Sequence, residues 1–279
     1  MDLSTILGLG QTALELGLIS GLTVLALFLS YSMLNICDLL TDGCFTLGAA
    51  VGATVAAAGH PYLAIAAAMA SGIVSGFITA FLQTKMGIDS LLSGIIVNTG
   101  LYSINIAIMG SSLVNLNKAD TVFTKMKDLL ADTVFAGQSK LAVALIAVVL
   151  VVLFLVFFLK TKLGLSIRAT GNNPAMVKSS SINPVFTIII GLCISNAFTA
   201  LSGCLMAHYH KSANIDMGTG IVTIALASLL IGRAFMGKGK LVFRIIGAVL
   251  GSFVFRLVYT IALRFNMPAS MLRLVSSVI

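Results

Sequence analysis

The sequence predicts an all-α membrane protein, a polytopic bundle of about eight to ten transmembrane helices that includes short broken or re-entrant helices. The 279 residues are 58% hydrophobic and only 9% charged, and their mean hydropathy is +1.08. Soluble domains are about 25% charged, so this chain cannot cover a water-facing surface with polar groups. The composition excludes an ordinary cytoplasmic enzyme, a secreted disulfide scaffold and a disordered tail.

Apolar runs mark the predicted spans, since a helix needs about 20 apolar residues to cross a hydrocarbon core about 30 Å thick. Two of the runs, the second and the seventh, are short, and each follows a polar break that contains glycine. Short broken segments at corresponding positions of two halves are typical of transporters built from structural repeats, with the pathway at the breaks. The predicted spans are Leu14–Ile36, Cys44–Ala58, Tyr62–Leu82, Leu91–Met109, Leu141–Leu159, Pro184–Ala207, Ile221–Phe235 and Val242–Phe265.

Basic residues predict the orientation of these spans. The net charge is +8, and the segments 160–178 and 232–244 each carry basic residues without any acid. Such loops stay in the cytoplasm, and two spans separate them, so they lie on the same side. The stretch 110–140 mixes lysine with aspartate, which is typical of an outer loop, and the N-terminus is then also outside. No removable signal peptide is expected, and the basic charge gives no reason to expect nucleic acid.

The outer loop 110–140 contains a candidate amphipathic helix. Apolar residues recur at helical spacing within Ala119–Leu130, and the charged residues lie off that stripe. This pattern indicates either a helix at the membrane interface or a docking surface for an external partner.

Small residues predict where helices pack closely. Gly48 and Gly52 lie four residues apart, and Gly191, Ser195 and Ser202 share one face of a later span. Small side chains let helix backbones approach each other in lipid.

Polar residues within the fourth span are the main candidates for a translocation path. Asn98, Tyr102 and Asn105 lie along one stripe with Gly94. Amide side chains cannot face hydrocarbon without hydrogen-bond partners, so they face either other helices or water. We hypothesise that this stripe lines a path and that an aromatic side chain gates it beside the first break. The path candidates are Ser93, Asn98, Tyr102, Asn105, Phe45, Asp42 and Arg256.

Arg256 is the one basic residue placed well inside a predicted span. An intramembrane arginine usually pairs with an acid or lines a cavity. It is expected either to pair with an outer acid such as Asp216 or to contact a substrate carboxylate. The four cysteines lack CxxC spacing and are expected to be free thiols, without a metal site. No HExxH motif, carboxylate pair or nucleophile–base set indicates a catalytic site.

The cytoplasmic loop 160–183 is predicted to carry a short helix. Asn173 can cap a helix and Pro174 suits its first turn, so a helix is expected over Pro174–Ser181. A short helix held between two spans can dock into a groove of another protein.

Residues 168–175, Arg-Ala-Thr-Gly-Asn-Asn-Pro-Ala, together with Ser181-Ile-Asn183, resemble the cytoplasmic loop of permease subunits from binding-protein-dependent ABC importers. The branch is the one that serves branched-chain amino acids and simple sugars. Residues 38–50 and 93–105 agree with it and look most like its tryptophan or aromatic amino-acid subgroup. The similarity extends from about Gly17 to Ser277. The family usually has glycine at the position of Ser181, and it tends to continue into one more apolar span.

The resemblance implies a single permease domain, residues 1–279, that acts as half of an importer. Two such subunits, as a homodimer or with a paralogous permease, would form the path in the cell membrane of a prokaryote. Two cytoplasmic ATPases would bind ATP and Mg²⁺, and an external solute-binding protein would deliver a small solute. An amino acid, first of all an aromatic one, is favoured, and a sugar or nucleoside stays open. The residues expected to couple to the ATPases are Arg168, Gly171, Asn172, Asn173, Pro174 and Lys178.

The chain itself is expected to carry no cofactor, because it has no Walker-type phosphate-binding loop. The alternative function is an ion-coupled secondary transporter of a small organic solute, which would need intramembrane carboxylates or unwound carbonyl groups for the ion. A small-solute channel would leave the basic docking loop unexplained.

Overall fold

The computed structural model describes residues 3–117, 119–129, 138–236 and 239–264, and the fold over these ranges is almost entirely helical. The final predicted span ends just beyond them, and any further span lies outside the described residues. The elements in chain order are α1 (Leu3–Leu27), the π-helix η1 (Phe28–Met33), α2 (Thr41–Ala57), α3 (Pro61–Thr84), α4 (Ser90–Met109), β1 (Leu113–Asn115), α5 (Val122–Leu129), α6 (Ser139–Phe158), α7 (Lys162–Asn172), α8 (Pro174–Ser179), α9 (Pro184–His210), β2 (Ser212–Asn214), α10 (Ile221–Met236) and α11 (Leu241–Arg264).

The structure confirms an all-α polytopic membrane protein. Six of the described helices are long and apolar enough to cross a bilayer: α1 with η1, α3, α4, α6, α9 and α11. The helices α2 and α10 are shorter, with 17 and 16 residues. They occupy the second and seventh predicted spans, and each begins after a non-helical break.

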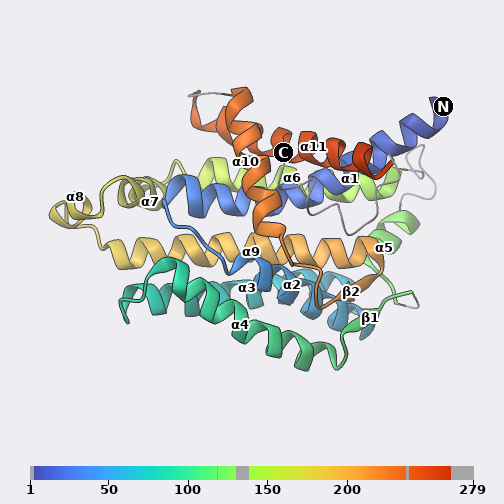
Figure 1. The fold of residues 1–279 in the computed structure, drawn as a ribbon, viewed down its shortest axis with the longest axis horizontal. Coiled ribbons are helices and arrows are strands. Elements are labelled where there is room, and N and C mark those ends of the chain that lie inside the picture. Colours follow the sequence, from blue (N-terminus) through green and yellow to red (C-terminus); the bar gives the residue numbers. More distant parts are fainter. Residues whose placement is uncertain (1–2, 118, 130–137, 237–238, 265–279) are drawn as a thin grey trace.

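The helices have two distinct ends (Figure 1). The helices α7 and α8 lie at one end, which we call the α8 end, and the end of α10 and the start of α11 lie toward the same end. The strands β1 and β2 pair antiparallel, with Leu113 opposite Asn214, and lie with α5 at the other end, which we call the strand end. The two acid-free basic segments are therefore brought to one end of the molecule.

The central helix α9 is packed through small residues on two sides. On the side of α2, a side chain at Gly48 would meet the backbone of Ala200, and one at Gly52 would meet Cys204. On the side of α1, the hydroxyl of Ser195 donates to the carbonyl of Ala26 at 2.8 Å. Close helix packing predicted from the small-residue spacings is thus confirmed, since only small side chains allow these approaches.

The segment 160–183 contains two helices where the sequence predicts one. The first, α7, begins at the cap Thr161, whose hydroxyl oxygen accepts from the Gly164 N–H at 3.3 Å. The second, α8, begins at the predicted Pro174 and ends at Ser179, two residues before the predicted end. Ser181, where the resembling family usually has glycine, takes the left-handed conformation with φ of 60°.

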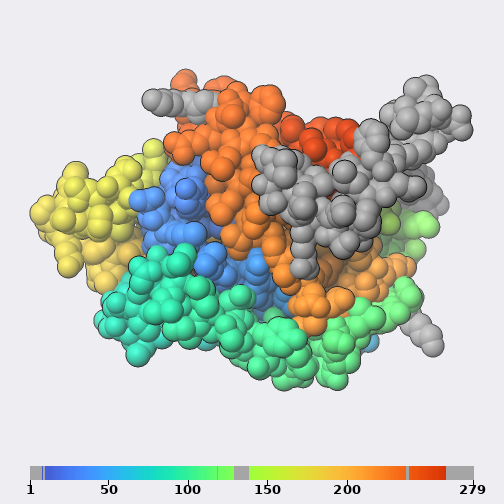
Figure 2. Space-filling model, in the orientation of Figure 1, coloured from blue at the N-terminus to red at the C-terminus, as the bar shows by residue number. Residues whose placement is uncertain are grey.

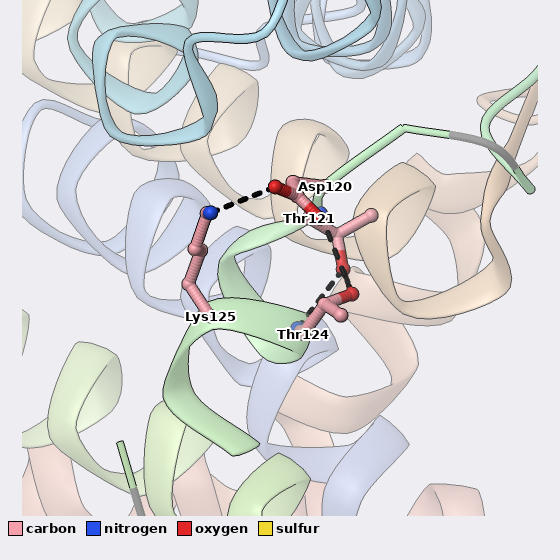
Figure 3. Close-up of polar contacts among 4 residues, drawn as sticks. All are labelled: Asp120, Thr121, Thr124 and Lys125. Carbon is pink, nitrogen blue, oxygen red and sulfur yellow. Dashed lines mark hydrogen bonds and ion pairs between the residues drawn. The ribbon is translucent and has the colours of Figure 1, made fainter. Parts of the chain in front are cut away.

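The helix α5 lies within the stretch predicted to be amphipathic, and its start is stabilised by a reciprocal cap (Figure 3). The Thr124 N–H donates to the hydroxyl of Thr121 at 3.2 Å, and the Thr121 N–H donates to the hydroxyl of Thr124 at 3.4 Å. Lys125 pairs with Asp120 at 2.7 Å, and this hydrogen bond raises the pKa of Lys125. The apolar side chains of Val122 and Phe123 are buried, so this face of α5 packs on the protein itself.

Candidate functional site

The two helix breaks meet in space, although about 180 residues separate them in the chain. Asp42, in the first turn of α2, accepts hydrogen bonds from the N–H groups of Gly220 and Val222, each at 2.9 Å. The N–H of Gly218 donates to the hydroxyl of Thr46 at 3.2 Å. Asp42 therefore caps the start of α10 from another helix, and its negative charge lies at the positive ends of both short helices.

Glycine is required where α10 begins. A side chain at Gly218 would collide with the backbone carbonyl of Asp42 and the hydroxyl of Thr46, and Gly220 has a φ of +84°. The second break can therefore pack against the first because Gly218 has no side chain. Space-filling shows α10 lying beside the N-terminal part of the chain on one face (Figure 2).

A buried carboxylate anchors the first break to the central helix. Asp38 is 1% exposed, and it accepts from the amide of Asn196 at 2.8 Å and from the N–H of Leu40 at 3.0 Å. The same Asn196 amide donates to the carbonyl of Leu192 at 3.0 Å. Its side-chain oxygen has no hydrogen-bond partner among the described residues. Asn196 was not among the predicted site residues, and a buried amide in the middle of an apolar span is the signal that points to it.

Two of the predicted path residues lie against the start of α2. The Asn105 side chain is buried and donates to the carbonyl of Gly43 at 3.3 Å. Asn98 lies so close to Gly43 that a side chain there would collide with its amide oxygen. Ser93 is buried on the same face of α4, whereas Tyr102 is 52% exposed at the edge of the stripe. The structure places Asn98 and Asn105 at the start of α2, whereas the Ser93 hydroxyl donates to the carbonyl of Ser90 in its own helix at 3.0 Å and Tyr102 lies apart.

The other two predicted path residues lie elsewhere. Phe45 is fully buried, and its carbonyl lies against Gly203 of α9, so it is a core residue in this conformation. Arg256 places its guanidinium 5.5 Å from the centre of the Tyr259 ring. Among the described residues it forms no ion pair with Asp216, which is exposed. The proposed pairing is therefore wrong for this conformation.

The predicted coupling residues connect α8 to the first span. Asn173 accepts from the N–H groups of Ala175 and Met176, both at 3.1 Å, and so caps α8 as predicted. A side chain at Gly171 would collide with the carbonyl of Met33, so α7 lies directly on the end of η1. Lys178 and Asn172 are exposed, whereas Arg168 is partly buried.

These contacts form one continuous structural connection. It extends from α8 through α7 to the end of η1, then along residues 34–40 to Asp42, and from Asp42 to the start of α10. Along this connection, α7 packs on η1 through the backbone at Gly171, and the Asp42 side chain joins α2 to the start of α10. Among the described residues, no group of three or more His, Cys, Asp or Glu side chains could hold a metal ion.

Comparison with known proteins gives a consistent picture. A family model described as "Branched-chain amino acid transport system / permease component" matches residues 11–279. A tyrosine transport system permease protein of Clostridioides difficile (strain R20291) is 33% identical over 264 residues, which cover 94% of this chain and 85% of that protein. The ribose import permease protein RbsC of Escherichia coli (strain K12) is 27% identical, with 78% of this chain and 67% of that protein covered.

A more distant relative is the nucleoside ABC transporter permease protein NupB of Lactococcus lactis subsp. cremoris (strain MG1363). It is 24% identical over 59% of this chain and 49% of its own length. No solved structure matches the chain.

Proposed function

Since this chain belongs to the family of permease components of branched-chain amino acid transport systems, we propose that it forms, as a dimer, the path of an ATP-driven importer for an amino acid. Permease components are transport subunits, so the chain is a multi-pass membrane protein that is not itself catalytic. The dimer is either a homodimer or a pair with a paralogous permease in the cell membrane of a prokaryote.

The observation that carries this proposal is the connection between α8 and the two helix breaks. An importer permease has no chemistry of its own and supplies two conformations whose populations ATP binding shifts. Two ATPase subunits, which hold ATP and Mg²⁺, would bind α8 at the cytoplasmic end. Their closure would act through Gly171 on η1 and through Asp42 on α10, at the depth where the two short helices meet.

Substrate class follows from the relatives alone. The relative that is 33% identical is a tyrosine permease, and the sugar and nucleoside permeases are less similar to this chain. We therefore propose an aromatic amino acid, delivered by an extracytoplasmic solute-binding protein that docks at the strand end.

The coupling role of α8 gives a direct test in a reconstituted complex of permease, ATPase and binding protein. Replacing Asn173 with alanine removes both cap hydrogen bonds of a helix of only six residues, and a lost cap costs about 1 kcal/mol. We expect ATPase activity to lose its stimulation by the loaded binding protein, while the binding protein still docks.

The matched control is Asn183→Ala, because Asn183 caps α9 in the same Asn-Pro sequence. The 27-residue helix α9 is anchored by its packing, so this variant should keep stimulated ATPase activity. Unchanged stimulation in Asn173→Ala, or a loss of stimulation that a loss of docking explains, would contradict the coupling role.

The path hypothesis predicts a separate phenotype for the α4 amides. The double variant Asn98→Leu, Asn105→Leu should lower uptake of tyrosine about tenfold or more in a complex that still assembles, because the amides beside Gly43 would no longer offer polar groups to a solute. Uptake is measured per assembled complex in proteoliposomes. Ser103→Leu, on the exposed face of the same helix, should leave uptake unchanged. Unaltered uptake in the assembled double variant would exclude these amides from the path.

A further inference from the structure

Three arginines from three different helices converge at the α8 end. They are Arg168 of α7, Arg233 in the last turn of α10 and Arg244 in the first turn of α11. Arg233 and Arg244 line one hollow together with Phe28 and Ser32 of η1. Arg168 does not line the hollow, but its positive charge, like that of Arg233, lies near enough to act on Arg244, which is partly buried. The fold thus brings these positively charged side chains together at one end of the molecule, although separate helices carry them.

No acidic side chain of these elements offsets this charge. The sequence contains no Asp or Glu in residues 133–215 and none after Asp216, which lies at the strand end. Among the described residues the one ion pair is Lys125–Asp120, also at the strand end. Clustered positive charges repel each other, and an anion bound between them offsets that repulsion. The arrangement therefore favours an anion bound from outside the chain.

The hollow itself has a volume of about 10 Å³, room for about one water molecule, so a larger anion would bind at its mouth. The chemistry at that mouth suits a phosphate group. Guanidinium groups present planar forks of N–H donors that match phosphate oxygens. The Ser32 hydroxyl is a further donor at the edge of the hollow. The Arg244 guanidinium is held over the Phe28 ring at 5.6 Å, which fixes its position. The lining side chains thus supply donors and no carboxylate acceptor.

Exposed apolar side chains lie close in sequence to Arg233 and Arg244. Phe235 is 71% exposed and Phe243 is 51% exposed, on the two helices that carry Arg233 and Arg244. A free phosphate ion would gain nothing from these side chains, whereas a phospholipid would lay its acyl chains over them. Basic pockets between helices at the cytoplasmic side are typical sites for anionic headgroups.

We propose that the arginines at the mouth of the hollow between η1, α10 and α11, with Arg168 nearby, bind the phosphate of an anionic phospholipid of the cytoplasmic leaflet. The bound headgroup bridges the end of the first span to the α10–α11 pair. Because α7 lies on η1 and carries Arg168, the lipid also holds the helix from which α8 extends. The proposed lipid site does not depend on which solute is transported. It depends on the proposed orientation of the chain only for which leaflet supplies the lipid.

The test uses the purified full-length permease without its ATPase, in nanodiscs of phosphatidylcholine with or without phosphatidylglycerol of the same acyl chains. Lipids that remain bound after release from the nanodisc are counted by native mass spectrometry. We expect phosphatidylglycerol to be retained about tenfold over phosphatidylcholine, and the double variant Arg233→Gln, Arg244→Gln to lose that preference. Arg233→Gln alone, a change of an exposed side chain, should weaken it and guards against misfolding of the double variant.

The matched control is Lys85→Gln, Lys160→Gln, which removes the same charge from exposed positions outside the hollow and should keep the preference. Equal retention of both lipids by the unaltered protein, or an equal loss in the control, would overturn the proposal. A second arm adds inorganic phosphate to phosphatidylcholine nanodiscs. Thermal stabilisation by phosphate equal to that by phosphatidylglycerol would also overturn it, because the site would then be one for free phosphate.

Discussion

Replacing Asp42 with alanine is expected to abolish uptake and to lower the stability of the inserted protein. The variant leaves the N–H groups of Gly220 and Val222 without the carboxylate that accepts from both. Hydrogen bonds to charged groups contribute about 1.5–3 kcal/mol each, so the loss of two should cost about 3–6 kcal/mol. At this junction α10 then keeps only the hydrogen bond from the Gly218 N–H to Thr46 and the packing of Gly218, so the carboxylate no longer makes the two helix breaks move together. Uptake in proteoliposomes and thermal unfolding in detergent measure the two effects.

Asp42→Asn separates charge from geometry. The amide oxygen can accept one of the two N–H groups, while the amide nitrogen is itself a donor, so an intermediate loss of stability is expected. Asp120→Ala is the control, because Asp120 is exposed and its ion pair with Lys125 is at the surface. It should change neither measurement. Full uptake by an Asp42→Ala protein would show that transport does not depend on this connection between α2 and α10.

Replacing Gly203 with alanine is expected to prevent assembly of the folded protein. The added methyl group would collide with the backbone carbonyl of Phe45, in the contact between α9 and α2. Backbone atoms inside two packed helices cannot turn away as a flexible side chain can. Overpacking costs about 1–3 kcal/mol when side chains can adjust, and this contact is expected to exceed that range. The yield of monodisperse protein in fluorescence-detected size exclusion measures the effect.

A graded series tests the reason for that loss. In Gly52→Ala the new methyl group meets the side chain of Cys204, so an intermediate yield is expected. In Gly100→Ala, on α4, nothing lies within 4 Å of the new atom, and the yield should match the unaltered protein or exceed it, since alanine favours helix. Equal yields for Gly203→Ala and Gly100→Ala would mean that α2 and α9 do not pack as described.

Much of the architecture could be read from local signals in the sequence. The long apolar runs predicted the six helices of the described residues that are long and apolar enough to span a bilayer, because a bilayer demands a fixed length of apolar helix. The second polar break predicted the start of α10 at Ile221, and Asn173-Pro174 predicted the start of α8. The first break predicted a start at Cys44, whereas α2 begins three residues earlier, at Thr41. The spacing of Gly48 and Gly52 predicted a close helix contact. Each of these signals depends on residues within about one turn to a few turns of each other.

Only the tertiary structure decided which of these elements touch and what the polar residues do. Asp42 and Val222 are far apart in the chain, and no local pattern pairs them. Asn196 is buried although it was not predicted as a site residue, and Tyr102 is exposed although it was predicted on the path. In a nearly uniform apolar sequence, hydropathy does not tell which side of a helix faces another helix and which faces lipid. Packing against neighbouring helices decides this. By itself the sequence therefore determined that this is a membrane protein with two broken helices and a basic loop, and the packing of those helices decided that one carboxylate joins the two breaks.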